Sequence, residues 1–250
     1  MRKKVIVLGG SSGIGKAIAE RFAKEGWQVM AAAPDLAATQ KVVNGLEGTG
    51  HIAVSLDVTN ESQIEDLKVQ VQEKFASFHA LINSIGISKD VDVLESDFIE
   101  WDYSLQVMLY GAVKLSRVLV PMIEDGGRII HITSIHHERV AKGSSAYGMA
   151  KAAVTQLTRS LAAELAPRNI LANAIAPGFV ETPMSVKTGG RNELESEWFK
   201  DNYIKHDHLP LKRAAKPEEI AGVAWFLAGP DASYITGSVV TVDGGLTITF

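Results

Sequence analysis

The chain has 250 residues, of which 46% are hydrophobic and 22% charged, with a formal net charge of −4 at pH 7. This composition suits one soluble domain with a large core, and it gives no reason to expect nucleic acid or an anionic membrane as a partner. The absence of cysteine excludes disulfides and thiolate metal sites and fits a reducing, cytoplasmic location. No uninterrupted apolar run approaches the roughly 18 residues that a membrane span needs.

Apolar strand-like segments alternate with helical segments along the chain. The predicted strands lie at 5–8, 28–33, 52–56, 80–83, 128–133, 170–176 and 238–242. The predicted helices lie at about 16–24, 36–46, 60–75, 98–123, 147–166 and 217–227. Strands that are apolar on both faces and alternate with helices are typical of a parallel sheet covered on both sides. The sequence therefore predicts an α/β fold in one domain, residues 1–250, with a doubly wound parallel sheet of about seven strands.

The segment 181–209 lacks a strong periodicity and carries five ring side chains: Trp198, Phe199, Tyr203, His206 and His208. Long segments of this kind in compact domains are often lids or binding loops, so we expect a substrate lid here. The three aromatic residues stand at helical spacing and are expected to form the inner face of the lid rather than an aromatic cage. The two histidines have no third ligand in view, so no metal site is predicted.

A glycine-rich turn follows the first predicted strand. Gly9, Gly13 and Gly15 separate this strand from a helix N-terminus, with Ser11 and Ser12 between them. Small residues let the backbone approach a pyrophosphate, whose charge is favoured by free N–H groups and by the helix dipole. The spacing is neither Gly-x-Gly-x-x-Gly nor a P-loop, so the turn is either a dinucleotide cradle or a merely tight strand–helix connection.

A second candidate site begins where the fifth predicted strand ends. Tyr147 and Lys151 stand four residues apart in a predicted helix and therefore share one of its faces. A lysine ammonium near a phenol lowers the tyrosine pKa, and a phenol with a lowered pKa can exchange a proton at neutral pH. Ser134, thirteen residues before Tyr147, could hydrogen-bond the same substrate oxygen.

Two further motifs, Asn83-Ser84-Ile85-Gly86 and Pro177-Gly178, follow the fourth and sixth predicted strands. Together with the glycine turn, Ser134 and Tyr147-x-x-x-Lys151, in this order and spacing, they resemble the classical short-chain dehydrogenases/reductases. The resemblance covers nearly the whole chain. It implies a Rossmann-type fold with NAD(P) at the C-terminal ends of the strands, and an oxidoreductase that interconverts a secondary alcohol and a ketone by hydride transfer.

The resemblance also implies roles for individual residues. Tyr147 would be the general acid/base, Ser134 its partner on the substrate oxygen, and Lys151 the group that lowers the pKa of Tyr147. The residues expected to bind the cofactor are Gly9, Ser11, Ser12, Gly13, Ile14, Gly15, Asp57, Val58, Asn83, Gly86, Tyr147, Lys151, Pro177, Gly178, Val180 and Thr182.

The end of the second predicted strand should distinguish NAD from NADP. An acid there accepts a hydrogen bond from the ribose 2′-hydroxyl, whereas a basic residue there, or just before Gly13, pairs with a 2′-phosphate. The chain has Ala33 and Pro34 at the strand end and Ser12 before Gly13, so neither the acidic residue nor the basic residue is present at these positions. Asp35 would repel a phosphate if it faced the pocket, or it caps the next helix. NAD is favoured on this basis, and NADP is not excluded.

One position departs from the family pattern. The long helix of such enzymes carries an Asn whose backbone carbonyl, through a water, links the lysine to solvent; Met108 occupies that position here. Either the carbonyl of Met108 still orders the water, which we favour, or the relay is rerouted and turnover slows. The alternative function is a catalytically weak or inactive dinucleotide-binding regulatory protein on the same fold.

The sequence indicates a small-molecule substrate with a carbonyl or alcohol group, and it leaves three classes open: a sugar or polyol, a hydroxysteroid, and an acyl thioester. His136 and His137 lie where family members often line the substrate pocket, so together with Ser134 and Tyr147 they are candidate substrate-binding residues, or else they cap the loop. The resemblance also implies a homo-oligomer, a tetramer or dimer. Its candidate interfaces are the long helix with Gly111 and the helix after Tyr147.

Overall fold

In the structure, a computed structural model that describes residues 2–186 and 190–249, the seven predicted strands all form. They are β1 (Lys4–Leu8), β2 (Gln28–Ala33), β3 (Ile52–Ser55), β4 (Phe78–Asn83), β5 (Ile123–Ile132), β6 (Leu171–Pro177) and β7 (Val239–Val242). Every pairing between them is parallel, in the order β3-β2-β1-β4-β5-β6-β7. The strand order reverses between β1 and β4, which is where open α/β sheets bind their ligands. The predicted doubly wound parallel sheet is confirmed.

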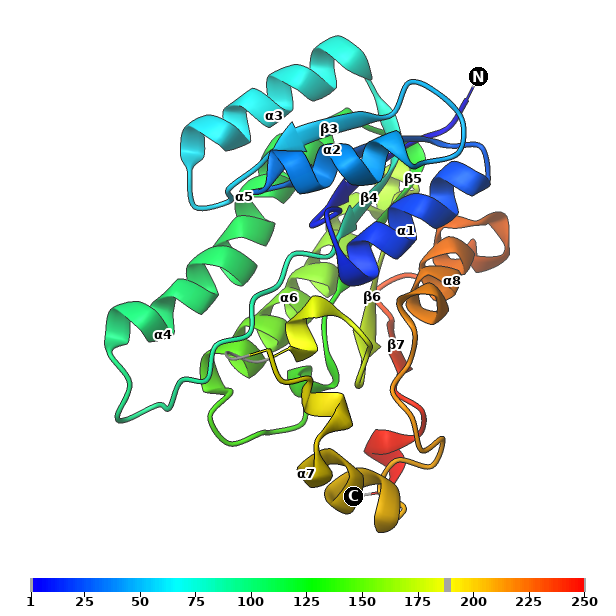
Figure 1. The fold of residues 1–250 in the computed structure, drawn as a ribbon. Helices are drawn as coiled ribbons and strands as arrows, with labels where there is room; N and C mark the ends of the chain where they lie inside the picture. The colour runs from blue at the N-terminus through cyan, green and yellow to red at the C-terminus, as the bar shows by residue number, and fades with distance from the viewer. Residues whose placement is uncertain (1, 187–189, 250) are drawn as a thin grey trace.

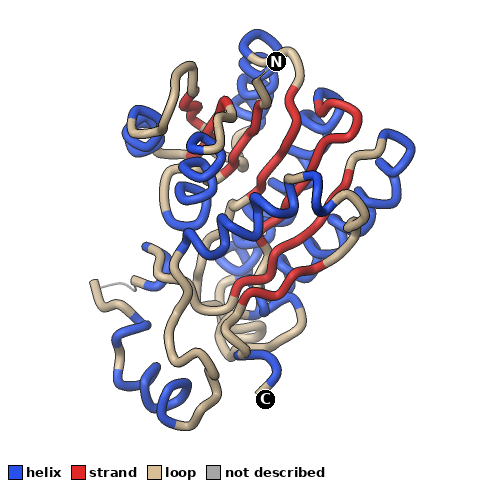
Figure 2. The backbone as a smooth tube through the Cα atoms, turned by 90° about the vertical axis from the view of Figure 1, so that its right-hand side faces the viewer, coloured by secondary structure: helices blue, strands red, loops and turns tan. Residues whose placement is uncertain are grey.

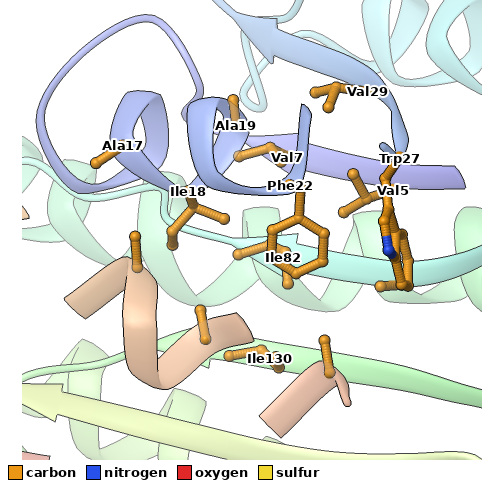
Figure 3. Packing of buried hydrophobic residues seen from close by; sticks show 14 of the residues in the cluster. Val5, Val7, Ala17, Ile18, Ala19, Phe22, Trp27, Val29, Ile82 and Ile130 are labelled. Atoms are coloured by element: carbon orange, nitrogen blue, oxygen red, sulfur yellow. The ribbon is translucent and has the colours of Figure 1, made fainter. Parts of the chain in front are cut away.

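Helices cover both faces of the sheet (Figures 1 and 2). One face packs against α1 (Gly13–Lys24), α2 (Leu36–Asn44) and α8 (Pro217–Ala228), and the other against α3 (Glu61–Lys74), α5 (Gly111–Leu119) and α6 (Ser145–Leu165). On the first face, Figure 3 shows the fully buried ring of Phe22 from α1 lying over Ile82 of the sheet. Burial of such a side chain stabilises the fold by about 1.5–3 kcal/mol.

The long helix predicted at 98–123 is interrupted. It consists of α4 (Phe98–Leu105), a π-helical segment (Gln106–Tyr110), α5, and a 3₁₀ turn (Val120–Met122). By length and composition Phe98–Met122 could cross a membrane, but 44% of its most apolar window is buried, and core helices of soluble proteins pass the same test. A Cβ atom on Gly111 would lie 2.9 Å from Val58 Cγ2. Gly111 is therefore buried in close contact with Val58 of the same chain, and it offers no surface to a second subunit.

Strand β5 begins five residues earlier than expected, at Ile123. Asp125-Gly126-Gly127 reads as a turn in the sequence, but the structure places it inside the strand, where the register against β4 shifts between Phe78 and Ala80. Gly126 has a φ of +79°, which a residue with a side chain rarely adopts. The bulge lets the strand continue through a sequence that is typical of a turn.

The segment 181–209 forms several short helices, of which α7 (Glu197–Phe199) continues into a π-helical turn (Lys200–Lys205). Phe199 and Tyr203 pack edge-on against Phe179, with ring centroids 4.9 and 4.7 Å apart, so they form the expected inner face. Trp198 differs because it is 53% exposed. Residues 187–189 lie outside the described part of the chain. Among the described residues, no group of three His, Cys, Asp or Glu side chains is arranged to hold a metal ion.

Candidate active site

A cavity of about 830 Å³ lies at the C-terminal ends of β1, β4, β5 and β6. Most of the residues predicted for the site line it: Gly9, Ser11, Ser12, Gly13, Ile14, Asp57, Val58, Gly86, Ser134, His136, Tyr147, Lys151, Pro177, Gly178, Val180 and Thr182. The C-terminal ends of parallel strands meet at one edge of a sheet, which is why motifs far apart in the sequence reach one cavity.

The glycine turn forms one end of this cavity. Gly9 and Gly13 both have positive φ, +79° and +50°, and a Cβ on Gly9 would lie 2.8 Å from the carbonyl oxygen of Ser84. The helix α1 begins at Gly13, and its N-cap, Ser12, makes no side-chain capping hydrogen bond. The first-turn N–H groups of α1 therefore have no side-chain partner and lie beside the cavity, as an anion-binding helix N-terminus requires.

Ser134 and Tyr147 meet at the other end. Ser134 follows β5 and caps a 3₁₀ turn (Ile135–His137), where its Oγ accepts the N–H of His136 at 3.2 Å. Tyr147 lies in the first turn of α6, whose start is held by Ser145: its Oγ accepts from Trp101 Nε1 at 2.8 Å and donates to the carbonyl of Val91. A hydrogen bond joins the hydroxyls of Ser134 and Tyr147.

Lys151 is buried beneath Tyr147. Its Nζ donates to the carbonyl oxygens of Ile132 at 2.9 Å and Ile85 at 3.3 Å, and it lies 5.6 Å from the centre of the Tyr147 ring. Burial lowers the pKa of Lys151 from 10.5 to about 8. The ammonium group is thus fixed between β5 and the loop after β4.

The pKa of Tyr147 departs from the expectation. We expected Lys151 to lower it, but desolvation of the partly buried phenol raises its pKa above 10. The hydrogen bond from Ser134 acts in the opposite direction and is the smaller effect. The spacing of Tyr147 and Lys151 predicts their proximity correctly, but it does not show how strongly the surrounding protein desolvates the phenol.

Three predicted site residues do not line the cavity. Gly15 lies behind the turn, where a Cβ would be 2.1 Å from the carbonyl oxygen of Gly9, so a side chain does not fit there. Asn83 is buried and its Oδ1 accepts the N–H of Ile85, which shapes the loop after β4. His137 turns away, pairs with Glu138 at 2.9 Å and borders a separate surface hollow.

The structure shows where Asp35 and Met108 lie relative to the cavity. Asp35 caps α2, its Oδ1 accepting the N–H of Ala38 at 2.9 Å, and it does not line the cavity, whereas Pro34 does. The capping interpretation of Asp35 is therefore confirmed. Met108 lies within the π-helical segment and is 2% exposed, packed in the apolar core, whereas the preceding residue, Val107, lines the cavity.

Sequence reasoning missed several residues at the substrate end of the cavity. They come from segments without a recognisable motif: Tyr103, Arg139, Leu246 and Thr247. Met184, Leu194, Trp198 and Tyr203 also line this end and belong to the segment 181–209, which the sequence does single out. Arg139 reaches the C-terminal tail, where its guanidinium donates to the carbonyl oxygen of Thr247 at 2.6 Å. A contact between residues 108 positions apart follows from the packing of the whole chain and leaves no local signal.

Comparison with known proteins identifies the family. A family model described as enoyl-(acyl carrier protein) reductase matches residues 9–247. The chain is 36% identical to a 3-oxoacyl-(acyl-carrier-protein) reductase of Thermotoga maritima, with 98% of each chain covered. Its structure matches a short-chain dehydrogenase/reductase from Serratia marcescens with a TM-score of 0.87, at 32% identity over 98% of both chains. The chain belongs to the short-chain dehydrogenase/reductase family.

A member of the short-chain dehydrogenase/reductase family with this fold is an oxidoreductase that acts on CH–OH or carbonyl groups with NAD or NADP. The structure also resembles L-sorbose reductase from Gluconobacter frateurii, solved with NADPH and L-sorbose. The TM-score is 0.89 at 30% identity, over all of this chain and 98% of that one. A small-molecule substrate follows from the family, and its identity does not.

Proposed function

We propose that the protein interconverts a secondary alcohol and a ketone, with Tyr147 as the general acid/base. The observation that carries this proposal is the meeting of Ser134, Tyr147 and Lys151 at the wall of the one cavity whose far end is the glycine turn at the start of α1. A phenol and a hydroxyl joined by a hydrogen bond offer two groups to one substrate oxygen. The segment 181–209 supplies Met184, Leu194 and Trp198 to the same cavity and is proposed as the substrate lid.

The residues present fit a dinucleotide. Gly9 and Gly13 keep side chains out of the turn, and the uncapped N-terminus of α1 offers N–H groups to a pyrophosphate. Asp57, Val58, Gly86, Val180 and Thr182 would hold the rest of the cofactor along the cavity. When bound, the nicotinamide ring supplies or accepts the hydride.

The chain's own groups handle the proton. In the reducing direction Tyr147 donates its phenolic proton to the substrate oxygen while Ser134 donates a hydrogen bond to the same atom; oxidation is the reverse. Because burial alone raises the pKa of Tyr147, the phenolate must be stabilised during turnover, and the Lys151 ammonium below the ring is the cation placed to do this. Asn83 contributes through the shape of its loop.

We infer NAD as the preferred cofactor. Around the end of β2 the cavity is lined by Ala33, Pro34, Ser11 and Ser12, none of which carries a positive charge for a 2′-phosphate. The preference rests on this missing cation and not on Asp35, which caps α2.

A cytoplasmic location is part of the same proposal, supported by the cysteine-free sequence.

Replacement of Tyr147 by Phe tests the proposal. Loss of the phenolic proton donor should lower kcat at least about a hundredfold for any accepted ketone, since a positioned acid/base contributes roughly 10²–10⁴. Hydride transfer is followed through nicotinamide absorbance, with NAD(H) and NADP(H) compared side by side; the wild type should favour NAD(H). Undiminished turnover in Tyr147→Phe would sink the assignment. Tight dinucleotide binding without wild-type turnover on a broad panel would favour the regulatory alternative.

A further inference from the structure

The imidazole of His136 is held next to the proposed reaction centre. Its backbone N–H donates to Ser134 Oγ at 3.2 Å, so the residue is attached directly to one of the two groups that meet the substrate oxygen. Its ring lies edge-on to the ring of Tyr147, with centroids 5.9 Å apart. His136 lines the main cavity and also borders the neighbouring surface hollow, whereas His137 borders only that hollow.

The hydrogen bonds of the ring determine its tautomer. Nδ1 lies 3.3 Å from the carbonyl oxygen of Arg139, and a carbonyl can only accept, so Nδ1 carries the proton. Burial lowers the pKa of His136, which keeps the ring neutral at pH 7. The remaining nitrogen, Nε2, therefore carries a lone pair, and no hydrogen bond within the described residues involves it. An acceptor in a part-buried cavity gains from a donor on the ligand.

We propose that Nε2 of His136 accepts a hydrogen bond from a hydroxyl on the carbon next to the reacting carbon. The substrate class is then vicinal diols and α-hydroxy ketones, the chemistry of polyols and sugars. This inference rests on the proposed function, because Ser134 and Tyr147 place the reacting oxygen. A hydroxyl on the adjacent carbon is the nearest donor that a ring beside Tyr147 can meet. A neutral lone pair repels a carboxylate or phosphate at that position, so an anionic group there is disfavoured.

The surroundings of the cavity fit the same chemistry. Trp198 and Tyr203 line its substrate end and meet edge-on at 5.4 Å, presenting aromatic surface to the C–H face of a polyhydroxylated chain.

The test compares two ketones with one carbon skeleton. Reduction of 3-hydroxy-2-butanone and of 2-butanone by the wild type should differ by about tenfold or more in kcat/KM in favour of the hydroxy ketone, the equivalent of about one hydrogen bond. His136→Phe keeps a ring against Tyr147 but removes the acceptor, and should bring the ratio of the two kcat/KM values towards one. His136→Gln keeps an acceptor oxygen and should retain part of the preference. His137→Phe, outside the cavity, should keep the wild-type ratio.

Binding gives the same comparison without turnover. Titration calorimetry on the complex of the enzyme with NADH, in which an alcohol has no hydride acceptor, should show 2,3-butanediol binding about tenfold more tightly than 2-butanol, with the difference lost in His136→Phe. A wild type that does not discriminate in either measurement, or a His136→Phe variant that still does, overturns the inference. The proposed function is tested separately. Undiminished turnover in Tyr147→Phe overturns the proposed function, whatever the result for His136. If Tyr147→Phe is inactive but the wild type shows no preference for the hydroxy ketone, only the role of His136 is overturned.

Discussion

At the scale of the residue, Lys151 places an ammonium group in a wall that is almost closed to solvent. Its side chain is 4% exposed and its partners are two neutral carbonyl oxygens, those of Ile85 and Ile132. Carbonyl dipoles compensate only part of the desolvation of a charge, so the pKa falls to about 8. The protein therefore gives up stability to keep a cation beneath Tyr147.

The cost of Lys151 should depend on pH. The unfolded chain keeps the proton up to about pH 10.5, whereas the folded chain releases it near 8, so the free energy of unfolding rises with pH between these values. Below pH 8 the full penalty is present. Lys151→Met should therefore be more stable than the wild type at pH 7 by about 3 kcal/mol, less the contribution of the two lost hydrogen bonds, and its advantage should shrink between pH 8 and 10.

Urea unfolding of both proteins at pH 7, 8, 9 and 10 measures the difference in the free energy of unfolding between Lys151→Met and the wild type. The contributions of the other titrating groups are the same in both proteins and cancel in this difference. A difference that does not change with pH would show that Lys151 is not desolvated as the structure implies. Activity should be lost at every pH, because Lys151 also supports the phenolate of Tyr147.

At the scale of the element, a buried side-chain bond joins the two elements that carry the proposed catalytic residues. His131 on β5 and Thr158 on α6 are both about 1% exposed, and Nδ1 of the histidine lies 2.8 Å from Oγ1 of the threonine. The Thr158 hydroxyl donates to the carbonyl of Val154, so the histidine must be the donor. Burial, and secondly the charge of Lys151, lower the pKa of His131 to about 4, which keeps it neutral. This bond fixes α6 against β5, which Ser134 follows by two residues.

Thr158→Val should destabilise the protein by about 1–3 kcal/mol, because it leaves a buried N–H of His131 without an acceptor. Thr155→Val is the matched control: Thr155 is equally buried on the same helix, but its hydroxyl bonds only to the Lys151 carbonyl within that helix. The midpoints of urea unfolding distinguish the two variants. Equal losses would mean that the link between β5 and α6 contributes nothing of its own.

The elements also show what sequence can predict here. The strands and the residues directly after them were predictable, because apolar runs and turn residues are local signals, and the cofactor end of the cavity is built from them. The π-helical segment was not, because Gln106–Tyr110 keeps the apolar pattern of an ordinary helix. The bulge at Gly126 was missed because the local sequence is typical of a turn. The strand continues through it only because β5 pairs with β4 on both sides of the bulge. At the substrate end, Ser134, His136 and the segment 181–209 were predictable, but residues such as Arg139 and Thr247 were missed because they meet only in the folded chain.

At the scale of the whole molecule, neighbouring helices expose several large apolar side chains. Phe98, Ile99 and Tyr110 are exposed on the helix Phe98–Met122, and Met149 is exposed on α6, which packs against α4. Monomeric soluble proteins rarely expose large contiguous apolar patches. The homo-oligomer implied by the sequence resemblance is therefore expected to use these side chains and not Gly111, which packs against Val58.

Sedimentation velocity should give a dimer or tetramer for the wild type. Ile99→Glu places a charge on a side chain that is 79% exposed on α4 and should lower the assembly state, because burying that charge costs several kcal/mol. Val69→Glu, an exposed apolar position on α3, should leave the assembly unchanged. A monomeric wild type contradicts the expectation outright.

The π-helical segment has a consequence for insertions and deletions. A five-residue hydrogen-bonded turn holds one residue more than an α-helical turn, and each residue of a helix corresponds to about 100° of rotation. Deleting one residue between Gln106 and Tyr110 would allow an unbroken α-helix and should leave α4 in nearly its present orientation relative to α5, because the five residues of the π turn cover about the same rotation as four α-helical residues. Trp101 would then keep its hydrogen bond to Ser145, and Ile99 would face the same direction as before. The π-helical segment therefore accommodates one additional residue without moving the outer surface relative to the start of the helix that carries Tyr147.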